Sequence, residues 1–530
     1  MIRLMRGCAV AGTIALLAAA SAQSRAQAEA PAIVSAQREA AVAAIMARAA
    51  RDPGELRLFL HAMPKGGDLH DHLSGALFAE DMIDWAGRKG LCVKADTTGF
   101  TQPPCAPGTQ AASLGQTAPE RYGRLVDSLS TRGWQAGVDA GAVDGHDQFF
   151  ATFARFDPAV EGSEAAAMVA LRRQAAREGV LYLELIHNPP ALLQAGLQAG
   201  LSAHAEPLDA NGLDAFFARE APHLAAMVPA MRQQIDAEEA QARTTQACGT
   251  PQAEPGCAVA VHYQAFVLRS VAPAAVFRSM ILAFALADKD PRFVGVNIVA
   301  PEDWPVARAD YDLHMAMFRF LEKRHPGVAV SMHAGELAFG SVPPADLADH
   351  IGKAVASGAR RIGHGVDIAF EDQGRATMAR MAREGVAVEI NLSSNAVILG
   401  VKGAEHPFEL YRHHGVPVVL ATDDAGVLRI DLTHEYQRAA SEHGLGYADL
   451  KALSRASLEY AFLPGVSLWN AHHPGSWAPA CVDGKLDAPA CRTLLAQSEK
   501  ARLQADLERR FASFETEVSF ETGEVAGAKL

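Results

Sequence analysis

The second half of the chain repeats one plan, in which a short apolar run rich in β-branched residues precedes an amphipathic segment with helical spacing. Four of these runs end in polar residues, which follow one another at intervals of 28 to 31 residues. That interval is close to the roughly 30 residues of a strand–helix–strand repeat. The four runs are 327–336, 359–366, 385–395 and 415–424, and their polar ends are His333, His364, Asn395 and Asp423.

Four earlier runs extend the series to eight candidate strands, at 68–75, 177–189, 258–269 and 292–303. Eight strands alternating with helices predict an α/β fold of the (β/α)8 TIM-barrel type, whose chemistry lies at the carboxyl ends of its strands. A doubly wound open sheet is the alternative. Such a sheet usually carries a glycine-rich phosphate loop after its first strand, and no GxGxxG follows any of these runs.

The remaining length is assigned to additions around the barrel. With 49% hydrophobic and 21% charged residues, the chain of 530 residues has the composition of an ordinary globular protein. We predict a helical N-terminal arm at 29–62 and a barrel at 63–470, which carries an insertion at about 91–145 and a loop at about 241–257. A C-terminal cysteine loop and helix would fill 471–530.

The first 28 residues have the pattern of an export signal. Arg3 and Arg6 precede an apolar stretch, and small-residue cleavage sites follow at Ala22 and Ala28. A membrane anchor is the alternative, but the apolar stretch falls short of the ~20 residues that span a bilayer. We therefore predict an exported protein, periplasmic or secreted, without membrane attachment after cleavage.

The cysteines agree with an oxidising compartment. Once Cys8 is removed with the signal, six cysteines remain as three near neighbours in stretches rich in Gly, Pro and Thr, where a short disulfide can staple a loop. Six cysteines permit 15 pairings, so local pairing is a hypothesis. Reduced thiols or a zinc knuckle are alternatives, although no CxxC occurs. The local pairs are Cys92–Cys105, Cys248–Cys257 and Cys481–Cys491.

Charge argues against a polyanionic partner. The formal net charge is −13 and becomes −16 when the signal leaves with its three arginines. The sequence also lacks a basic stripe that would neutralise phosphates, so nucleic-acid binding is not expected. A small molecule is the expected partner.

Two histidines stand at i and i+2 in the first candidate strand. In an extended segment, His70 and His72 point to the same side, and His333 and Asp423 end two other candidate strands. Taken singly, His333 is better explained as a buried histidine, and Asp423 is better explained as a helix N-cap. Together, three imidazoles and one carboxylate predict a site for one Zn²⁺ that leaves a position for water, although other divalent ions accept the same ligands.

Three further groups flank these ligands. Glu336 lies three residues after His333, where burial would raise its pKa and let it act as an acid. His364 lies between two glycines and would orient or deprotonate the water. Asp424, beside Asp423, needs a cation or a substrate N–H to hold it. For Glu336 the alternative is a glutamate at the start of a helix. For Asp424 it is one of two exposed acids at a turn.

Five sequence blocks, in their order along the chain, resemble the signature of the adenosine deaminase family of zinc-dependent barrel hydrolases. They are MPKGGDLHDHLSG, SMHAGE, RIGHGV, EINLSSN and LATDD, and the resemblance extends from about residue 60 to 465. The MPK opening, the arm, the export signal and the phrase FVGVNIVAPED are similar to the secreted branch, the adenosine deaminase-related growth factors and their bacterial relatives.

The resemblance implies a hydrolytic deamination in which water adds at purine C6 and ammonia leaves, so that adenosine becomes inosine. It implies that Glu336 protonates purine N1, that His364 handles the attacking hydroxide, and that Asp424 contacts the N7 region. It also implies that zinc is bound by His70, His72, His333 and Asp423.

Some positions depart from the family pattern. Ser74 stands where the family often has an acid near the ribose, and Ala300 replaces a glycine whose backbone meets purine N3. Further departures are NLSSN at 391–395 and TDDAG at 422–426. None of these departures removes a predicted zinc ligand. The predicted substrate-binding residues are His72, Ser74, Ala300 and Asp424.

Several functions remain open at this point. The favoured one is an adenosine and 2'-deoxyadenosine deaminase, and the nearest alternatives are a deaminase of another aminopurine or modified adenosine, or an amidohydrolase that cleaves a C–N bond. A non-catalytic exported nucleoside-binding or signalling protein is the alternative from another class. The N-terminal arm also suggests a homodimer in which arms exchange contacts.

Overall fold

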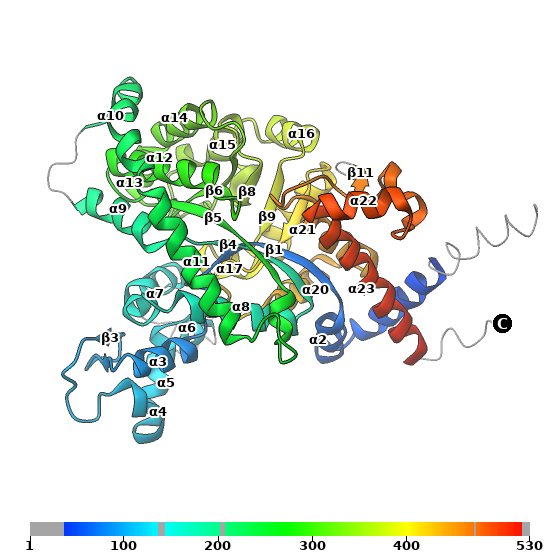
Figure 1. Cartoon of the computed structure of the whole chain (residues 1–530), viewed down its shortest axis with the longest axis horizontal. Coiled ribbons are helices and arrows are strands. Elements are labelled where there is room, and N and C mark those ends of the chain that lie inside the picture. Colours follow the sequence, from blue (N-terminus) through cyan, green and yellow to red (C-terminus); the bar gives the residue numbers. More distant parts are fainter. Residues whose placement is uncertain (1–35, 136–143, 202–206, 471–472, 522–530) are drawn as a thin grey trace, which may run out of the picture.

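The computed structural model describes residues 36–135, 144–201, 207–470 and 473–521 (Figure 1). The predicted signal at 1–28 lies outside the described residues. The main core is a continuous set of buried apolar side chains that links the central sheet to the helices around it.

Eight parallel strands form one sheet in chain order, which confirms the predicted (β/α)8 barrel. The first and last strands meet at a bridge between Asp71 and Asp423. There the amide of His72 donates to the carbonyl of Asp423 at 3.0 Å, and the amide of Asp423 donates to the carbonyl of His70 at 2.8 Å. The strands are β1 (Lys65–His72), β4 (Val180–Ile186), β5 (Ala260–Leu268), β6 (Phe293–Val299), β7 (Ala329–Ala334), β8 (Arg361–His364), β9 (Ala387–Ile390) and β10 (Val418–Leu420).

One predicted strand end is wrong. β9 ends at Ile390, and Asn395 lies one turn into helix α17 (Leu392–Ile398) rather than at the end of a strand. The apolar run continues through both elements because the helix is also buried, so hydropathy alone does not mark the change.

Helices follow the strands and cover the barrel. They are apolar where they face it: α12, for example, buries Val276, Met280 and Phe284. The helices between strands are α8 (Glu164–Arg177), α9 (Pro190–Leu201), α10 (Leu213–Ala225), α11 (Val228–Thr245), α12 (Pro273–Lys289), α13 (Pro305–Ala309), α14 (Tyr311–Glu322), α15 (His350–Ala356), α16 (Gly374–Glu384) and α18 (Phe408–His413). After β10 come α19 (Ala425–Leu428), α20 (Leu432–His443) and α21 (Tyr447–Glu459).

The three predicted disulfides are all present, as Cys92–Cys105, Cys248–Cys257 and Cys481–Cys491. The second lies in the segment predicted as a loop at about 241–257, whose first residues, up to Thr245, are the end of α11. The third joins the 3-10 helix η6 (Pro479–Gly484) to helix α22 (Pro489–Gln497). The short strands of these regions are β2 (Cys92–Val93), β3 (Phe100–Thr101), β11 (Trp469–Asn470) and β12 (His473–Trp477).

The insertion after β1 is mainly helical and lies at one end of the molecule (Figure 1). Its helices combine short surface turns with a longer helix, α7, that begins at the capping residue Asp144. They are α3 (Ala79–Arg88), α4 (Leu114–Thr117), α5 (Pro119–Ser128), α6 (Arg132–Gln135) and α7 (Gly145–Val160).

The N-terminal arm packs against the C-terminal helix of its own chain, where Figure 1 draws blue beside red. Residues 36–49 and α2 (Pro53–Ala62) form the arm, and α23 (Glu499–Glu521) is its neighbour. Lys451 joins the two by ion pairs with Glu39 and Glu515. Exchange of arms between two chains stays a prediction.

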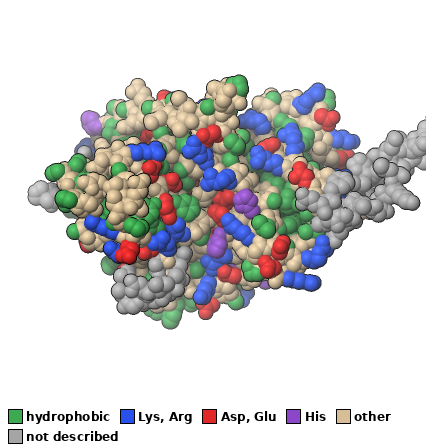
Figure 2. Space-filling view, turned by 90° about the horizontal axis from the view of Figure 1, so that it is seen from below, with side chains coloured by type: hydrophobic (Ala, Val, Ile, Leu, Met, Phe, Trp, Pro, Cys, Tyr) green, Lys and Arg blue, Asp and Glu red, His purple; other side chains and the backbone are tan. Residues whose placement is uncertain are grey.

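The surface is mixed in charge. Figure 2 shows acidic and basic side chains interspersed over one face of the molecule, as expected of a chain with net charge −13 and 21% charged residues. Among the described residues, no helix combines the length and apolar character required to cross a membrane.

Candidate active site

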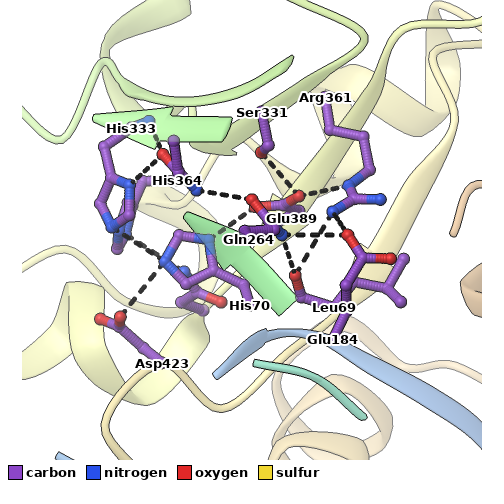
Figure 3. A network of polar contacts seen from close by, with 12 residues as sticks. Leu69, His70, Glu184, Gln264, Ser331, His333, Arg361, His364, Glu389 and Asp423 are labelled. Atoms are coloured by element: carbon purple, nitrogen blue, oxygen red, sulfur yellow. Dashed lines mark hydrogen bonds and ion pairs between the residues drawn. The ribbon is translucent and has the colours of Figure 1, made fainter. Parts of the chain in front are cut away.

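Three imidazoles and one carboxylate meet at the carboxyl end of the barrel. Figure 3 labels His70, His333 and Asp423 among them. The Nε2 atoms of His70 and His333 are 3.0 Å apart, and those of His72 and His333 are 3.2 Å apart. Asp423 Oδ1 is 3.3 Å from Nε2 of both His70 and His72. The structure therefore brings together all four residues predicted as metal ligands, from β1, β7 and the turn after β10.

The chemistry of these donors fits a cation. Nδ1 of His70 faces Glu389 Oε2 at 2.6 Å, and Nδ1 of His333 faces Asn297 Oδ1 at 2.9 Å. Because both acceptors require a hydrogen on Nδ1, two neutral rings would face one another with lone pairs on Nε2, and these repel unless a proton or a metal ion lies between them. Tetrahedral zinc with nitrogen ligands places those ligands about 3.3 Å from one another, close to the separations observed.

The surrounding carboxylates also favour a positive charge at this point. Burial disfavours the ionised carboxylate of Asp423, but hydrogen bonding to His70 and His72 outweighs burial and holds the pKa of Asp423 well below its usual range. For His70 the cost of burial is outweighed by hydrogen bonds with Asp423 and Glu389, which raise its pKa to about 10. A divalent ion would satisfy the same carboxylates without that proton.

Glu389 holds the ring of His70 within the cluster of His70, His72, His333 and Asp423. Its carboxylate accepts from Ser331 Oγ at 2.9 Å and pairs with Arg361, which in turn pairs with Glu184 (Figure 3). Burial opposes ionisation, but the charge of Arg361 and the bond to His70 lower the pKa of Glu389 to about 2. The ring of His70 is thus held in one orientation by an ionised partner.

Glu336 lies beside the cluster, with Oε1 3.7 Å from His364 Nε2. Burial, reinforced by Asp423 and Glu302, raises its pKa well above the usual range. The backbone amide of Glu336 donates to Glu302 Oε2 at 2.9 Å, so a buried carboxylate from the loop after β6 fixes the loop that carries Glu336. A protonated carboxylic acid at this position is a candidate proton donor.

His364 and Asp424 complete the candidate site. Burial lowers the pKa of His364 to about 3, so the ring is neutral, and within the described chain its Nε2 has no hydrogen-bond partner. Burial and the adjacent Asp423 raise the pKa of Asp424 well above its usual range. Asp424 Oδ1 is likewise buried without a partner among the described residues.

Comparison with known proteins places this geometry in a family. The sequence model of the family described as adenosine deaminase matches residues 143–467, which is more than half of the chain. The chain belongs to the adenosine deaminase family. The matched residues begin after β1 and so do not include His70 and His72. The geometry of the barrel brings these two histidines to the matched site residues.

The curated relatives match over a shorter stretch. The adenosine deaminase of Erwinia tasmaniensis is 36% identical over 146 residues, covering 27% of this chain and 41% of that protein. The adenosine deaminase of Escherichia coli O7:K1 is 37% identical over 145 residues, covering 27% and 40%. The chain therefore spans about two fifths of the length of the curated relatives it matches.

Solved structures are more distant. An N6-mAMP deaminase from Arabidopsis is 17% identical and aligns over 77% of this chain and 96% of its own, with a TM-score of 0.47. An adenine deaminase from Arthrobacter aurescens is 16% identical and aligns over 76% and 94%, with a TM-score of 0.46.

Two predicted substrate contacts, Ala300 and Ser74, directly follow barrel strands or lie in the turns after them. Ala300 directly follows β6 and has φ of 85°, in the left-handed region that favours glycine. His364 and Asp423 share this feature, with φ of 69° and 62°. Such strain gathers at functional sites, where the surrounding structure holds it in place. Ser74 lies in the turn after β1 and is half-buried.

Gly75 has a steric role that the sequence did not reveal. A Cβ atom at this position would lie 1.5 Å from Asp424 Oδ1, so only glycine lets the turn after β1 approach that carboxylate. The glycine was visible in HLSG, but nothing in the spacing connected it to Asp424, 349 residues later.

Sequence analysis also missed the residues that hold the ligands. Glu389 and Asn297 orient His70 and His333, and Glu302 braces the backbone of Glu336. A polar residue inside an apolar strand is a usable signal for the first two, because a fully buried carboxylate or amide needs a partner. Glu302 lies just after β6, in VAPED, so it shows the same pattern as the predicted site residues: a polar side chain that follows an apolar strand.

Proposed function

We propose that the protein is an exported zinc-dependent deaminase that converts adenosine and 2'-deoxyadenosine to inosine and 2'-deoxyinosine with release of ammonia. The observation that carries the proposal is the meeting of His70, His72, His333 and Asp423 beside Glu336, in a chain of the adenosine deaminase family. Its partner is a purine nucleoside.

The four clustered residues would hold one Zn²⁺ per chain. When bound, the ion polarises a water molecule and lowers its pKa toward neutrality. Three histidines and one carboxylate suit zinc, and the buried carboxylates beneath them supply the negative charge that the ion balances.

Each remaining group has one task. Glu336 holds a proton in its buried position and delivers it to the purine ring nitrogen N1, which makes C6 more electrophilic. His364 orients the attacking water, and Asp424 positions the base through the N7 region. All three side chains are buried, so bulk water does not compete for these contacts.

Export is supported by the three cystine pairs of the mature chain, because disulfides of this kind persist in oxidising compartments. The apolar segment that follows Arg3 and Arg6 would be the cleaved signal. Mass spectrometry of the protein recovered from the periplasm and medium would test this, with a mature N-terminus near Ala28 expected. Retention of an uncleaved chain in the cytoplasm would contradict export.

Turnover is tested with purified zinc-loaded protein and a panel of adenosine, 2'-deoxyadenosine, adenine, AMP and N6-methyladenosine. Ammonia release is expected to be fastest with the first two. Glu336→Gln, which keeps the shape but cannot donate an acidic proton, should reduce kcat by at least about 10³-fold. If another member of the panel is turned over faster, that compound and not adenosine is the preferred substrate.

Absence of turnover across the panel would favour a binding protein. In that case isothermal titration calorimetry with adenosine should still show binding to the zinc-loaded chain. Metal analysis completes the test: about one equivalent of zinc is expected, and none in His333→Ala.

A further inference from the structure

Three buried side chains, His406, Asn395 and His364, form a line of hydrogen bonds that runs from the start of helix α18 to the candidate site. It begins at the backbone amide of Phe408, which donates to Nδ1 of His406 at 3.1 Å. A backbone N–H is a donor in every protonation state, so Nδ1 of His406 must accept. A neutral His406 therefore carries its ring hydrogen on Nε2.

The direction of that hydrogen bond passes to the next residue. Nε2 of His406 lies 3.0 Å from Oδ1 of Asn395, which accepts, and the opposite end of the same amide is 2.9 Å from Nδ1 of His364. The amide group of Asn395 donates there, and Nδ2 of Asn391 points to the same atom at 3.4 Å. Nδ1 of His364 therefore accepts.

The line ends at the candidate site. With Nδ1 accepting, His364 carries its hydrogen on Nε2, the atom that faces Glu336 at 3.7 Å. No solvent can reverse the order, because His406 is 3% exposed and both Asn395 and His364 are 0% exposed. Burial lowers the pKa of His406 to about 3, which keeps that ring neutral.

We propose that His406 is a positioning residue that, through Asn395, fixes the Nε2–H tautomer of His364 and so makes His364 a hydrogen-bond donor to the reacting water. This inference rests on the proposed function and deepens it. The sequence left open whether His364 orients or deprotonates the water, and a ring that donates from Nε2 orients it.

Capping alone does not account for the arrangement. A histidine that only capped the start of α18 would use Nδ1 and leave Nε2 free, whereas here both ring nitrogens are engaged in a fixed order. Asn395 is equally well placed for the purpose, because an amide is the side-chain group that accepts at one end and donates at the other.

The first test reverses the line. In Asn395→Asp a carboxylate accepts from both neighbours, which moves the hydrogen of His364 to Nδ1 and leaves a lone pair on Nε2. With the zinc-loaded enzyme we expect kcat to fall about 10²-fold to 10³-fold, since a misdirected tautomer removes the group from catalysis, while KM changes less than about threefold.

The second test removes the start of the line. His406→Leu frees the Asn395 amide to rotate, and kcat should fall at least about tenfold. His406→Gln can still donate to Asn395 while losing the bond to Phe408, so it should restore most of the activity. His443→Leu is the matched control, because that ring lies 6.4 Å from His406 and takes no part in the line.

The decisive readout is the tautomer itself, which needs no substrate. Long-range ¹⁵N–¹H spectra of zinc-loaded protein labelled in its histidine rings should show His364 as Nε2–H, with its signals assigned from His364→Gln. Asn395→Asp should show Nδ1–H, and His406→Leu a mixture. Should His406→Leu fail to fold, His406→Gln and Asn395→Asp still decide the matter.

The two proposals fail differently. A wild-type His364 found as Nδ1–H, or a tautomer unchanged in both Asn395→Asp and His406→Leu, would overturn the role of His406 even in an active deaminase. A protein that turns over none of the panel but shows the expected tautomers would refute the deaminase and leave the positioning role intact.

Discussion

Two buried polar clusters of this protein are built in opposite ways. Where the arm meets the barrel, Lys65 Nζ donates to the carbonyls of Leu60, Met63 and Glu178 at 2.7 to 3.1 Å, so each of its three hydrogens has an acceptor. At the candidate site, imidazole lone pairs face one another, and two adjacent acids share one turn.

The difference shows what each cluster is for. The cluster around Lys65 has all its hydrogen bonds within the chain, so it stabilises the fold without a ligand. The candidate site keeps polar atoms that have no partner among the described residues, and three non-glycine residues at positive φ, which costs stability and leaves groups ready for a ligand. Substitutions in the two clusters should therefore have opposite consequences for activity and stability.

Asp423→Asn should give the largest effect. Loss of one charged ligand is expected to abolish zinc binding and to reduce kcat/KM at least about 10³-fold. Stability of the metal-free protein should change little, because the lost pairing of Asp423 with His70 and His72 is offset by relief of the crowding with Asp424, and asparagine tolerates positive φ.

Metal analysis, ammonia release and thermal unfolding check this prediction. Glu80→Gln, which removes a half-exposed partner of Arg429, is the control and should leave all three readings unchanged. A marked fall in the Tm of metal-free Asp423→Asn would show that the site contributes to the fold.

Lys65→Met should show the reverse pattern. Three buried carbonyls lose their donor, which should lower the free energy of unfolding by about 3 kcal/mol. The folded fraction should keep its kcat within about threefold. Urea unfolding measures the loss, and Lys353→Met, whose partners Asp312 and Asp349 are exposed, should cost less than about 0.5 kcal/mol.

His146 offers a smaller, pH-dependent test at the start of α7. A hydrogen bond to Asp303 outweighs partial burial and raises the pKa of His146 to about 9. Because the folded pKa is above the unfolded value near 6.5, this contribution is complete below about pH 6.5 and is lost as pH rises through 9.

Unfolding in urea at pH 6 and at pH 9.5 measures that contribution. Wild type should lose about 1 kcal/mol more than His146→Gln over this interval, a figure reduced for solvent screening. The exposed His413, replaced by Gln, is the control. An equal loss in wild type and His146→Gln would show that the pairing of His146 with Asp303 does not stabilise the fold.

Ala300→Gly should have the smallest effect on stability. Relief of the left-handed strain is expected to raise the free energy of unfolding by about 0.5–1 kcal/mol. Ala247→Gly is the matched control, since Ala247 has φ of 52° in the loop closed by Cys248.

The comparison separates strain from function. Both glycine variants should gain similar stability by urea unfolding, but only Ala300→Gly should alter KM for adenosine. A KM unchanged by Ala300→Gly would place that residue outside the substrate site.

Much of this was accessible from local pattern. The eight strands were predicted because parallel barrel strands are short apolar runs at regular spacing, and the disulfides because each pair closes a short loop. The proposed ligands were found because parallel strands bring their carboxyl ends to one face. Asn395 was misplaced because burial on both sides hides the change from strand to helix.

The amino-acid sequence by itself determined the barrel, its staples and the set of residues that gathers at its mouth, since these depend on periodicity and on the direction of parallel strands. Only the tertiary structure decided which neighbours orient them: Glu389 under His70, Gly75 against Asp424, and His406 behind His364. Such contacts join side chains across the barrel at arbitrary separations in the chain. The geometry of packing sets them, and no spacing along the sequence records it.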